Sequence, residues 1–234
     1  PLTGQWIVDT GAADAPIVST NRLPLTDWVE FGAGGFVTKW YDQSGKGNTA
    51  IQTDPAKKPM IVDAISELTD GIQFDGGDTL DLTADIIAST NNVTSFLVSQ
   101  TNDISSSTIP LALSRNSPDA ARYYLGAVNA GNFYLGYGTD AYEINLGTAD
   151  TSAHLFSATS NNTATEAFID AVSKGTTSSV NAFSSLSSGG IGSMNGFNDY
   201  SGAISEIIIY DSDQGGNRIA IETNINDHYD IFNI

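Results

Sequence analysis

The 234-residue chain contains no cysteine. This absence excludes a disulfide framework, a zinc–thiolate site and a thiol nucleophile, so packing alone must stabilise the fold. Long apolar runs are also missing, because no stretch approaches the roughly twenty residues that cross a bilayer. The first residues, Pro1 to Asp9, lack the pattern of a signal peptide.

Positive charge is scarce. Nine Lys and Arg residues face 27 Asp and Glu residues, which gives a formal net charge of −18. A surface this acidic repels the phosphates of nucleic acids and anionic lipids, so neither is an expected partner. The two histidines, His154 and His228, are predicted to be packing or surface residues, and no G-x-S-x-G elbow supports a serine-hydrolase triad.

What the sequence does contain is typical of strands joined by polar turns. Apolar residues make up 40% of the chain, and Gly, Ser, Thr, Asn and Asp supply much of the rest. Short runs rich in β-branched and aromatic residues predict strands at Ile72–Phe74, Val93–Ser99, Ile109–Leu113, Tyr123–Val128, Asn132–Tyr137, His154–Thr159, Glu166–Val172 and Ala203–Tyr210. The turn from Asn129 to Asn132 predicts a hairpin. We expect two packed antiparallel sheets in a single domain over residues 1–234.

Two segments have a helical pattern. A short helix is predicted over Pro24–Phe31, where Gly32 permits the left-handed stop. Near the end of the chain, Ile221, Ile225, Tyr229 and Phe232 recur with a helical period, so this helix should pack one face on the sandwich. The serine-rich stretch Thr176–Ser188 is interpreted as a strand followed by a flexible loop.

Several motifs carry a family resemblance. The first is Trp40-Tyr41-Asp42-Gln43-Ser44-Gly45-Lys46-Gly47-Asn48, and it is followed by Lys58–Val62, Gly71–Asp78 and Tyr200–Tyr210. Together they resemble arabinofuranosidase B-like modules and related concanavalin A-like, or laminin G-like, domains. The resemblance implies an all-β concanavalin A-like antiparallel sandwich, a jelly roll, with the short N-terminal helix and the C-terminal helix added to it.

Asp42 has a structural interpretation that does not depend on the family. Its carboxylate is placed to accept backbone N–H bonds from the Ser44–Gly47 loop, whose glycines allow close approach. A structural turn is therefore preferred over a ligand-binding role.

The proteins that this chain resembles include enzymes, bacterial adhesins and particle proteins of phages and marine viruses. The leading hypothesis is a non-catalytic recognition or decoration protein at a virion or cell surface, extracellular and lectin-like. Its partners would be a glycan or host-surface receptor and other virion or fibre proteins, in a possible homo-oligomer. One alternative is a purely structural virion or fibre subunit without a ligand.

The second alternative is an arabinofuranosidase-like glycoside hydrolase, which needs two carboxyl groups across the scissile bond. Asp42, Asp75, Glu143 and Glu206 are the acids to test first. The catalytic domains that the chain resembles carry a cysteine-containing segment beside the nucleophile, and this chain has no cysteine. We therefore expect no enzyme activity.

Sugar recognition combines aromatic platforms with amide or carboxylate groups. Candidates in the central hairpin are Tyr134, Tyr137, Tyr142 and Asn132. The polar, glycine-containing loop before the last strand is the better candidate. The predicted ligand-binding residues are Asn195, Phe197, Asn198, Asp199 and Tyr200 in that loop, together with Tyr137.

Calcium is the one cofactor for which the sequence offers ligands. Asp75, Asp78 and Asp81 supply several carboxylate oxygens within a short glycine-containing loop, and calcium prefers such ligands. A calcium ion that shapes a binding loop is therefore an expectation, although the EF-hand spacing is absent.

Overall fold

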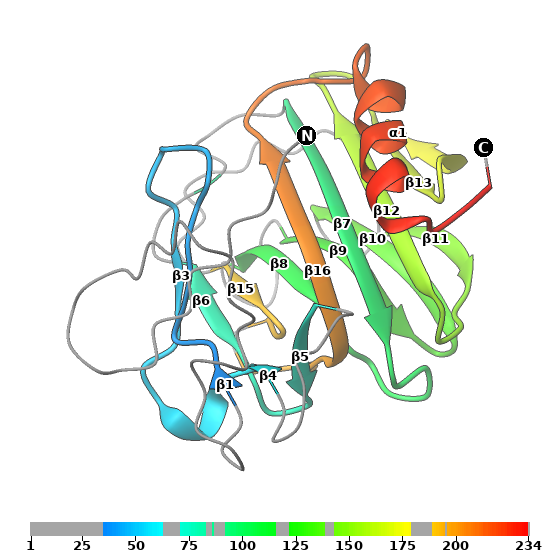
Figure 1. Ribbon diagram of the computed structural model, residues 1–234. Helices are drawn as coiled ribbons and strands as arrows, with labels where there is room; N and C mark the ends of the chain where they lie inside the picture. The colour runs from blue at the N-terminus through cyan, green and yellow to red at the C-terminus, as the bar shows by residue number, and fades with distance from the viewer. Residues whose placement is uncertain are drawn as a thin grey trace.

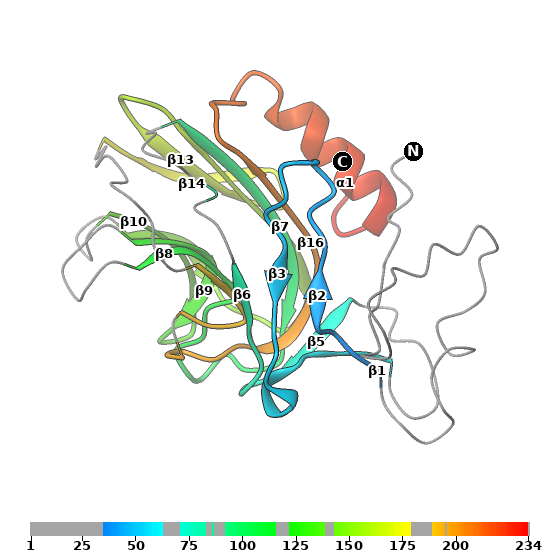
Figure 2. The same cartoon turned by 90° about the vertical axis from the view of Figure 1, so that its left-hand side faces the viewer.

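The computed structural model describes residues 35–62, 71–82, 86, 92–115, 122–138, 143–178, 189–194 and 196–233. Within these ranges the chain forms two antiparallel sheets of eight strands each, stacked face to face (Figures 1 and 2). This arrangement confirms the predicted all-β sandwich. The predicted helix Pro24–Phe31 and most of the stretch Thr176–Ser188 lie outside the described residues.

The first sheet has the strand order β1-β4-β5-β16-β7-β12-β13-β14. Its strands are β1 (Gly35–Phe36), β4 (Met60–Val62), β5 (Ile72–Asp75), β16 (Ser201–Tyr210), β7 (Val93–Thr101), β12 (Ala153–Ser160), β13 (Thr165–Ile169) and β14 (Val172–Thr177).

The second sheet has the order β11-β10-β9-β8-β15-β6-β3-β2. Its strands are β11 (Glu143–Thr148), β10 (Asn132–Gly138), β9 (Arg122–Asn129), β8 (Leu111–Arg115), β15 (Gly190–Ile191), β6 (Leu80–Leu82), β3 (Ala50–Ile51) and β2 (Lys39–Trp40). A short 3-10 helix, η2 (Pro55–Lys57), follows β3.

Each of the eight predicted runs overlaps a strand. The predicted run Glu166–Val172 is corrected, because it crosses a turn at Asp170 and Ala171 that separates β13 from β14. Both turn residues have positive φ, 51° and 63°, and this reverses the chain where the sequence suggests continuous extension. The predicted hairpin is confirmed, since Ala130 and Gly131 at its tip also have positive φ.

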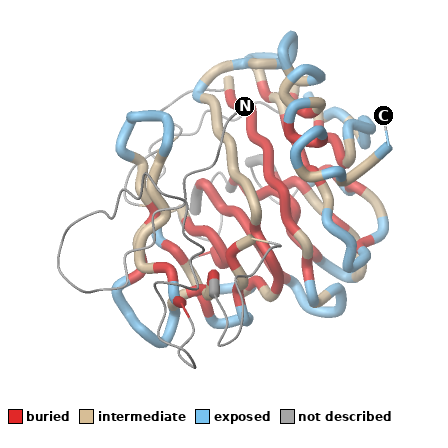
Figure 3. Tube along the Cα trace, viewed as in Figure 1, coloured by how far each residue is buried: buried red, intermediate tan, exposed pale blue. Residues whose placement is uncertain are grey.

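The core lies between the two sheets. Burial in Figure 3 is densest along the central strands, and all nine residues of β7 except Gln100 are buried. A strand buried on both faces must be covered from both sides. The inner face of β7 meets the second sheet, and its outer face lies under a helix.

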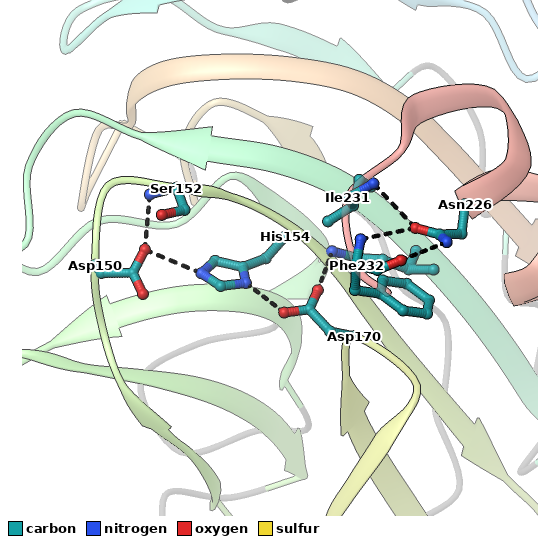
Figure 4. Close-up of polar contacts among 8 residues, drawn as sticks. Asp150, Ser152, His154, Asp170, Asn226, Ile231 and Phe232 are labelled. Carbon is teal, nitrogen blue, oxygen red and sulfur yellow. Dashed lines mark hydrogen bonds and ion pairs between the residues drawn. The ribbon is translucent and has the colours of Figure 1, made fainter. Parts of the chain in front are cut away.

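That helix is α1 (Arg218–Tyr229), which covers the outer face of the first sheet (Figure 2). Ile225, with 3% of its surface exposed, packs in one cluster with Phe96, Val98 and Leu155. The prediction of a terminal helix packed on the sandwich is confirmed. The helix ends at Tyr229, before the predicted Phe232. The Asn226 side chain holds the segment that follows, because its Oδ1 accepts from the backbone N–H groups of Ile231 and Phe232 at 3.0 and 2.9 Å (Figure 4).

The buried Glu222 and its partner Arg218 also attach α1 to the sheet. Glu222, 1% exposed, accepts hydrogen bonds from the Ser157 hydroxyl of β12 and from Arg218 one turn earlier. The Arg218 guanidinium lies 3.8 Å above the centre of the Phe168 ring. A buried carboxylate needs such partners, because an unpaired buried charge costs several kcal/mol.

The loop after β2 has the structure predicted for Asp42. Its Oδ1 accepts from the Ser44 N–H at 2.7 Å, and its Oδ2 accepts from the Asn48 N–H at 2.9 Å. Burial opposes the charged form of Asp42, but the hydrogen bonds from Ser44, Asn48 and Gly47 outweigh burial and lower the pKa of the carboxyl. The structural interpretation of this motif is confirmed.

Among the described residues, no helix has the length and apolar character needed to span a membrane.

Candidate functional site

The two outer faces of the sandwich differ. Helix α1 covers the first sheet, whereas the described chain places no helix on the outer face of the second sheet (Figures 1 and 2). On that face the loop Gly192–Asp199 folds back over β15, since a side chain added at Gly190 would meet the Ser193 carbonyl oxygen at 2.7 Å. On one side of this loop the face continues over β8 to β11, and on the other side it continues over β6, β3 and β2.

One row of side chains crosses these four strands. Strand register places Ala112, Tyr124, Gly136 and Glu143 side by side on β8, β9, β10 and β11. Paired residues point to the same face of a sheet. The Tyr124 ring lies across β10, because a Cβ atom on Gly136 would be 2.1 Å from Cζ of Tyr124. The Tyr124 hydroxyl donates a hydrogen bond to Glu143 Oε1 on the next strand.

A second row lies beside the first. Ala127, Tyr134 and Asn145 are register partners on β9, β10 and β11. Tyr134 is half-buried against an apolar cluster of Ile109, Ala112, Tyr124, Ala127 and Met194. Asn145 is exposed, and its Oδ1 accepts from the Gly147 N–H at 2.8 Å, which restrains the side chain.

The loop Gly192–Asp199 adds a third aromatic side chain. Met194 and Phe197 exchange backbone hydrogen bonds of 3.0 and 3.2 Å, which makes a tight turn. The Asn198 carbonyl accepts from the Ile109 N–H at 2.8 Å, so the loop is tied to the segment that enters β8. Phe197 is 58% exposed although its backbone is held. We call Tyr124, Tyr134, Glu143, Asn145 and Phe197 the aromatic face.

This arrangement combines apolar ring surface with polar groups that accept or donate hydrogen bonds. Binding sites for small organic ligands have this combination, in which apolar contact provides affinity and a few placed polar groups provide specificity. The sequence suggested Tyr134 and Phe197 but not Tyr124 or Asn145. Only strand register shows that Tyr124, Tyr134 and Asn145 share one face.

The predicted loop residues have different positions. Phe197 and Asn198 are exposed, with Asn198 at a positive φ of 57°, and Asp199 is half-buried. Tyr200 is a correction, because it is 1% exposed and belongs to the core. Its ring meets the edge of Phe74 with centroids 6.3 Å apart, its hydroxyl donates to the Ala203 carbonyl at 3.3 Å, and burial raises its pKa.

Three other predicted sugar-site residues stay predictions. Asn195 and Tyr142 lie outside the described residues. Tyr137 pairs with Tyr123 in the ladder between β9 and β10, and its side chain also lies outside the described part of the chain.

The predicted calcium loop lies next to the predicted sugar loop. The Gly76 N–H donates to the Tyr200 carbonyl at 3.1 Å, which joins segments more than a hundred residues apart. Asp75 Oδ1 accepts from the Gly77 N–H at 2.9 Å, and Asp78 Oδ2 accepts from the Asp75 N–H at 3.0 Å. Burial, with a smaller contribution from the charge of Asp75, raises the pKa of Asp78 to about 6.

Asp81 lies apart, exposed on β6. Within the described ranges, no group of three or more His, Asp or Glu side chains is placed to hold a metal ion. Calcium binding at Asp75, Asp78 and Asp81 therefore stays a prediction from the sequence, and the carboxylates of Asp75 and Asp78 act here as turn caps.

The four acids considered for hydrolysis lie on separate elements. Asp42 caps its turn, Asp75 ends β5, and Glu143 belongs to the aromatic face. Glu206 lies on β16 under α1, where burial raises its pKa. Glu143 and Glu206 are thus on opposite outer faces of the sandwich and are not placed to act on one bond.

A partly buried polar cluster surrounds His154 at one end of the sandwich (Figure 4). The ring packs against Phe133 and Phe156, with centroids 5.3 and 5.8 Å apart. Its Nδ1 lies 2.7 Å from Asp170 Oδ2, and its Nε2 lies 3.1 Å from Asp150 Oδ1. The predicted packing role is confirmed, but the sequence did not indicate the two carboxylate partners.

No protein-family model matches the sequence, and no curated protein matches it. Solved structures share its fold. A GH54 α-L-arabinofuranosidase is similar with a TM-score of 0.63 and 13% identity, over 86% of this chain and 53% of the other. Domain 4 of a GH43 extracellular arabinanase from Geobacillus stearothermophilus, in complex with arabinotriose, has a TM-score of 0.55 and 14% identity, over 82% of this chain and 88% of that domain.

A third similar structure is the CBM40 of a Ruminococcus gnavus IT-sialidase, bound to α2,3 sialyllactose. Its TM-score is 0.55 at 14% identity, over 66% of this chain and 96% of that module. At these identities the likenesses show the fold, which is the concanavalin A-like jelly roll expected from the sequence motifs, and no specific family.

Proposed function

We propose that this domain is a non-catalytic recognition module that acts outside the cell and binds a glycan on the aromatic face. The observation that carries the proposal is the difference between the two outer faces. One is covered by α1, and the described part of the other presents Tyr134 packed on an apolar cluster, its register partner Asn145, and the exposed Phe197 of the adjoining loop.

The chemistry of this face suits a sugar. The C–H face of a sugar ring is apolar and stacks on aromatic side chains, whose large rigid surfaces are ordered at low entropic cost. The hydroxyl groups of the sugar need partners that accept and donate hydrogen bonds, and Glu143 and Asn145 are exposed beside the rings.

The similar structures support the same proposal. Two of them are carbohydrate-bound in their descriptions, one with arabinotriose and one with sialyllactose. The arabinanase is described as extracellular. We propose that this chain shares two properties of these proteins, namely sugar binding and an extracellular setting.

Glycan-array binding followed by titration calorimetry tests the proposed function. We expect Tyr134→Ala and Phe197→Ala each to weaken binding of the best array ligand by about fivefold or more, since loss of an aromatic contact costs more than about 1 kcal/mol. Tyr41→Ala and Phe36→Ala are matched controls, because these side chains are partly exposed elsewhere. Equal affinity of all four variants would place the site elsewhere, and no binding to any glycan would favour the structural-subunit alternative.

Display on a virus particle or fibre is the finer part of the proposal, and it rests on the sequence resemblance. Mass spectrometry of purified particles tests it, with a fixed stoichiometric amount of this chain as the expected result. The non-catalytic role is tested with chromogenic furanosides and pyranosides, for which we expect no turnover. Turnover abolished by Glu143→Gln would instead support the hydrolase alternative.

A further inference from the structure

Glu143 is held in place by an arrangement that needs three strands. The Tyr124 ring starts on β9, crosses β10 over Gly136, and donates its hydroxyl to Glu143 on β11. Any side chain at position 136 would collide with this ring. The carboxylate is thus fixed beside Tyr134 and Asn145, although Glu143 itself is exposed.

The Glu143 carboxylate can accept more hydrogen bonds than the one from Tyr124. An ionised carboxylate accepts about four hydrogen bonds, and Tyr124 uses one of these sites. Hydrogen bonds to a charged acceptor are stronger than those between neutral groups. Glu143 can therefore accept from hydroxyl groups of a ligand that stacks on Tyr134, without first losing side-chain freedom.

The same carboxylate opposes anionic ligands. It is an exposed acidic group in a chain whose formal net charge is −18. On the same row, Gly190 pairs with Ala112 and with Asp81, which adds a second exposed carboxylate across the sheet. Lys39 lies on the edge strand β2, and Arg115 pairs with Arg122 at the ends of β8 and β9, two residues along β9 from Tyr124.

From this geometry we infer that Glu143 determines ligand specificity on the aromatic face, and that the ligand is a neutral glycan rather than a sialylated, uronic acid or sulfated one. This inference rests on the proposed function. It adds the chemical class of the ligand and the residue that selects it. Tyr124 is a positioning residue, because it acts through Glu143.

The first test compares matched glycans. An array carries neutral oligosaccharides beside counterparts that differ by one sialic acid, uronic acid or sulfate, including lactose and 3′-sialyllactose. We expect the neutral member of each binding pair to bind about tenfold more tightly, and the difference to shrink when salt screens the charges. Tighter binding of the acidic members would overturn the inference and point to Arg115 or Arg122. Binding of no glycan at all would overturn the proposed function itself.

The second test uses charge-matched variants. Glu143→Gln removes the charge and keeps the shape, so it should reduce the preference for neutral glycans several-fold. Asp227→Asn removes the same charge from the exposed side of α1, on the opposite face, and should leave the preference unchanged. An unchanged preference in Glu143→Gln would overturn the role of Glu143.

The third test separates positioning from folding. Tyr124→Phe keeps the ring over Gly136 and removes the hydroxyl that holds Glu143. We expect weaker binding of neutral glycans and a reduced preference, with the melting temperature changed no more than in Tyr229→Phe, whose hydroxyl donates to Ser205 O on the other face. A variant that melts like wild type and binds like wild type would show that Tyr124 does not position Glu143.

Discussion

At the residue scale, His154 connects the core to two surface carboxylates at one end of the sandwich. It lies between two aromatic rings of the core, and both ring nitrogens face carboxylates from different segments. Burial disfavours the charged imidazole, but the hydrogen bonds and charges of Asp170 and Asp150 outweigh burial and raise the pKa of His154 above 6.5. The neighbouring Leu155 N–H also donates to Asp170 at 3.0 Å, so the cluster joins β12 to the turn before β14.

This raised pKa predicts an alkaline loss of stability. The stabilising contribution of a charged His154 is fully present below its unfolded pKa of 6.5 and is lost as pH rises through its higher folded pKa. We expect the free energy of unfolding of wild type to exceed that of His154→Gln by more at pH 6 than at pH 9. Urea denaturation at both pH values measures this, with the exposed His228→Gln as control. A difference independent of pH would mean that His154 is neutral in the folded protein.

Asp78 also makes the fold less stable as pH rises, but because its charged form is disfavoured rather than because a stabilising charge is lost. Its folded pKa of about 6 is above its ordinary value of 3.8, so its ionisation destabilises the fold increasingly between these two pH values. Asparagine retains the oxygen that accepts from the Asp75 N–H without the buried charge. We expect Asp78→Asn to be more stable than wild type at pH 8, by about 1 kcal/mol or more, and to lose this advantage near pH 4.

The same variant tests the calcium prediction. If calcium uses Asp78, millimolar calcium should raise the melting temperature of wild type but not that of Asp78→Asn. Equal melting temperatures with calcium and with chelator, in both proteins, would remove calcium from this loop.

At the scale of elements, the sequence predicts those elements whose structure depends on residues close together in the chain. Strands followed from short β-branched runs between turn residues, α1 followed from its helical period, and the Asp42 turn followed from a carboxylate two residues before a serine. Strands of two residues, such as β15, have no pattern of their own and form because β6 and β8 pair with them.

The candidate site was harder to predict for a related reason. Tyr123 is in the core and the adjacent Tyr124 is on the outer face, and nothing in two consecutive tyrosines indicates which one faces inward. Likewise, Tyr200 follows a polar loop in the sequence, which suggests an exposed side chain. Its side chain is instead buried in the core just before β16. His154 and Asp170 are 16 residues apart, and the pairing of β12 with β13 brings them into contact.

Helix α1 permits a matched test of packing. Ile225 and Ile219 belong to the same helix, with 3% and 69% of their surfaces exposed. Ile225→Ala should destabilise the protein by about 2–4 kcal/mol, because it leaves a cavity over β7 and β12, whereas Ile219→Ala should cost less than about 0.5 kcal/mol. Chemical denaturation of both variants measures the difference. Similar values would mean that α1 contributes little to the global stability.

At the scale of the whole molecule, strands that are distant in the chain are neighbours in the sheets. Strand β16, from the last quarter of the chain, pairs with β5 and β7, and β15 pairs with β6 and β8. Neither the first nor the second half can complete a sheet alone. We therefore expect a single cooperative unfolding transition, with calorimetric and van't Hoff enthalpies that agree. Two transitions, or two protease-resistant halves, would contradict the predicted single domain.

The irregular registers at two sheet edges have a further consequence. Edge strands β14 and β11 contact each other, and each is shifted against its neighbour beside a glycine of positive φ, Gly175 or Gly147. Bulged, twisted margins are poor templates for a strand from another molecule. Along this side we therefore expect little backbone pairing between copies of the protein, and side chains rather than main-chain groups are left to make contacts with other molecules.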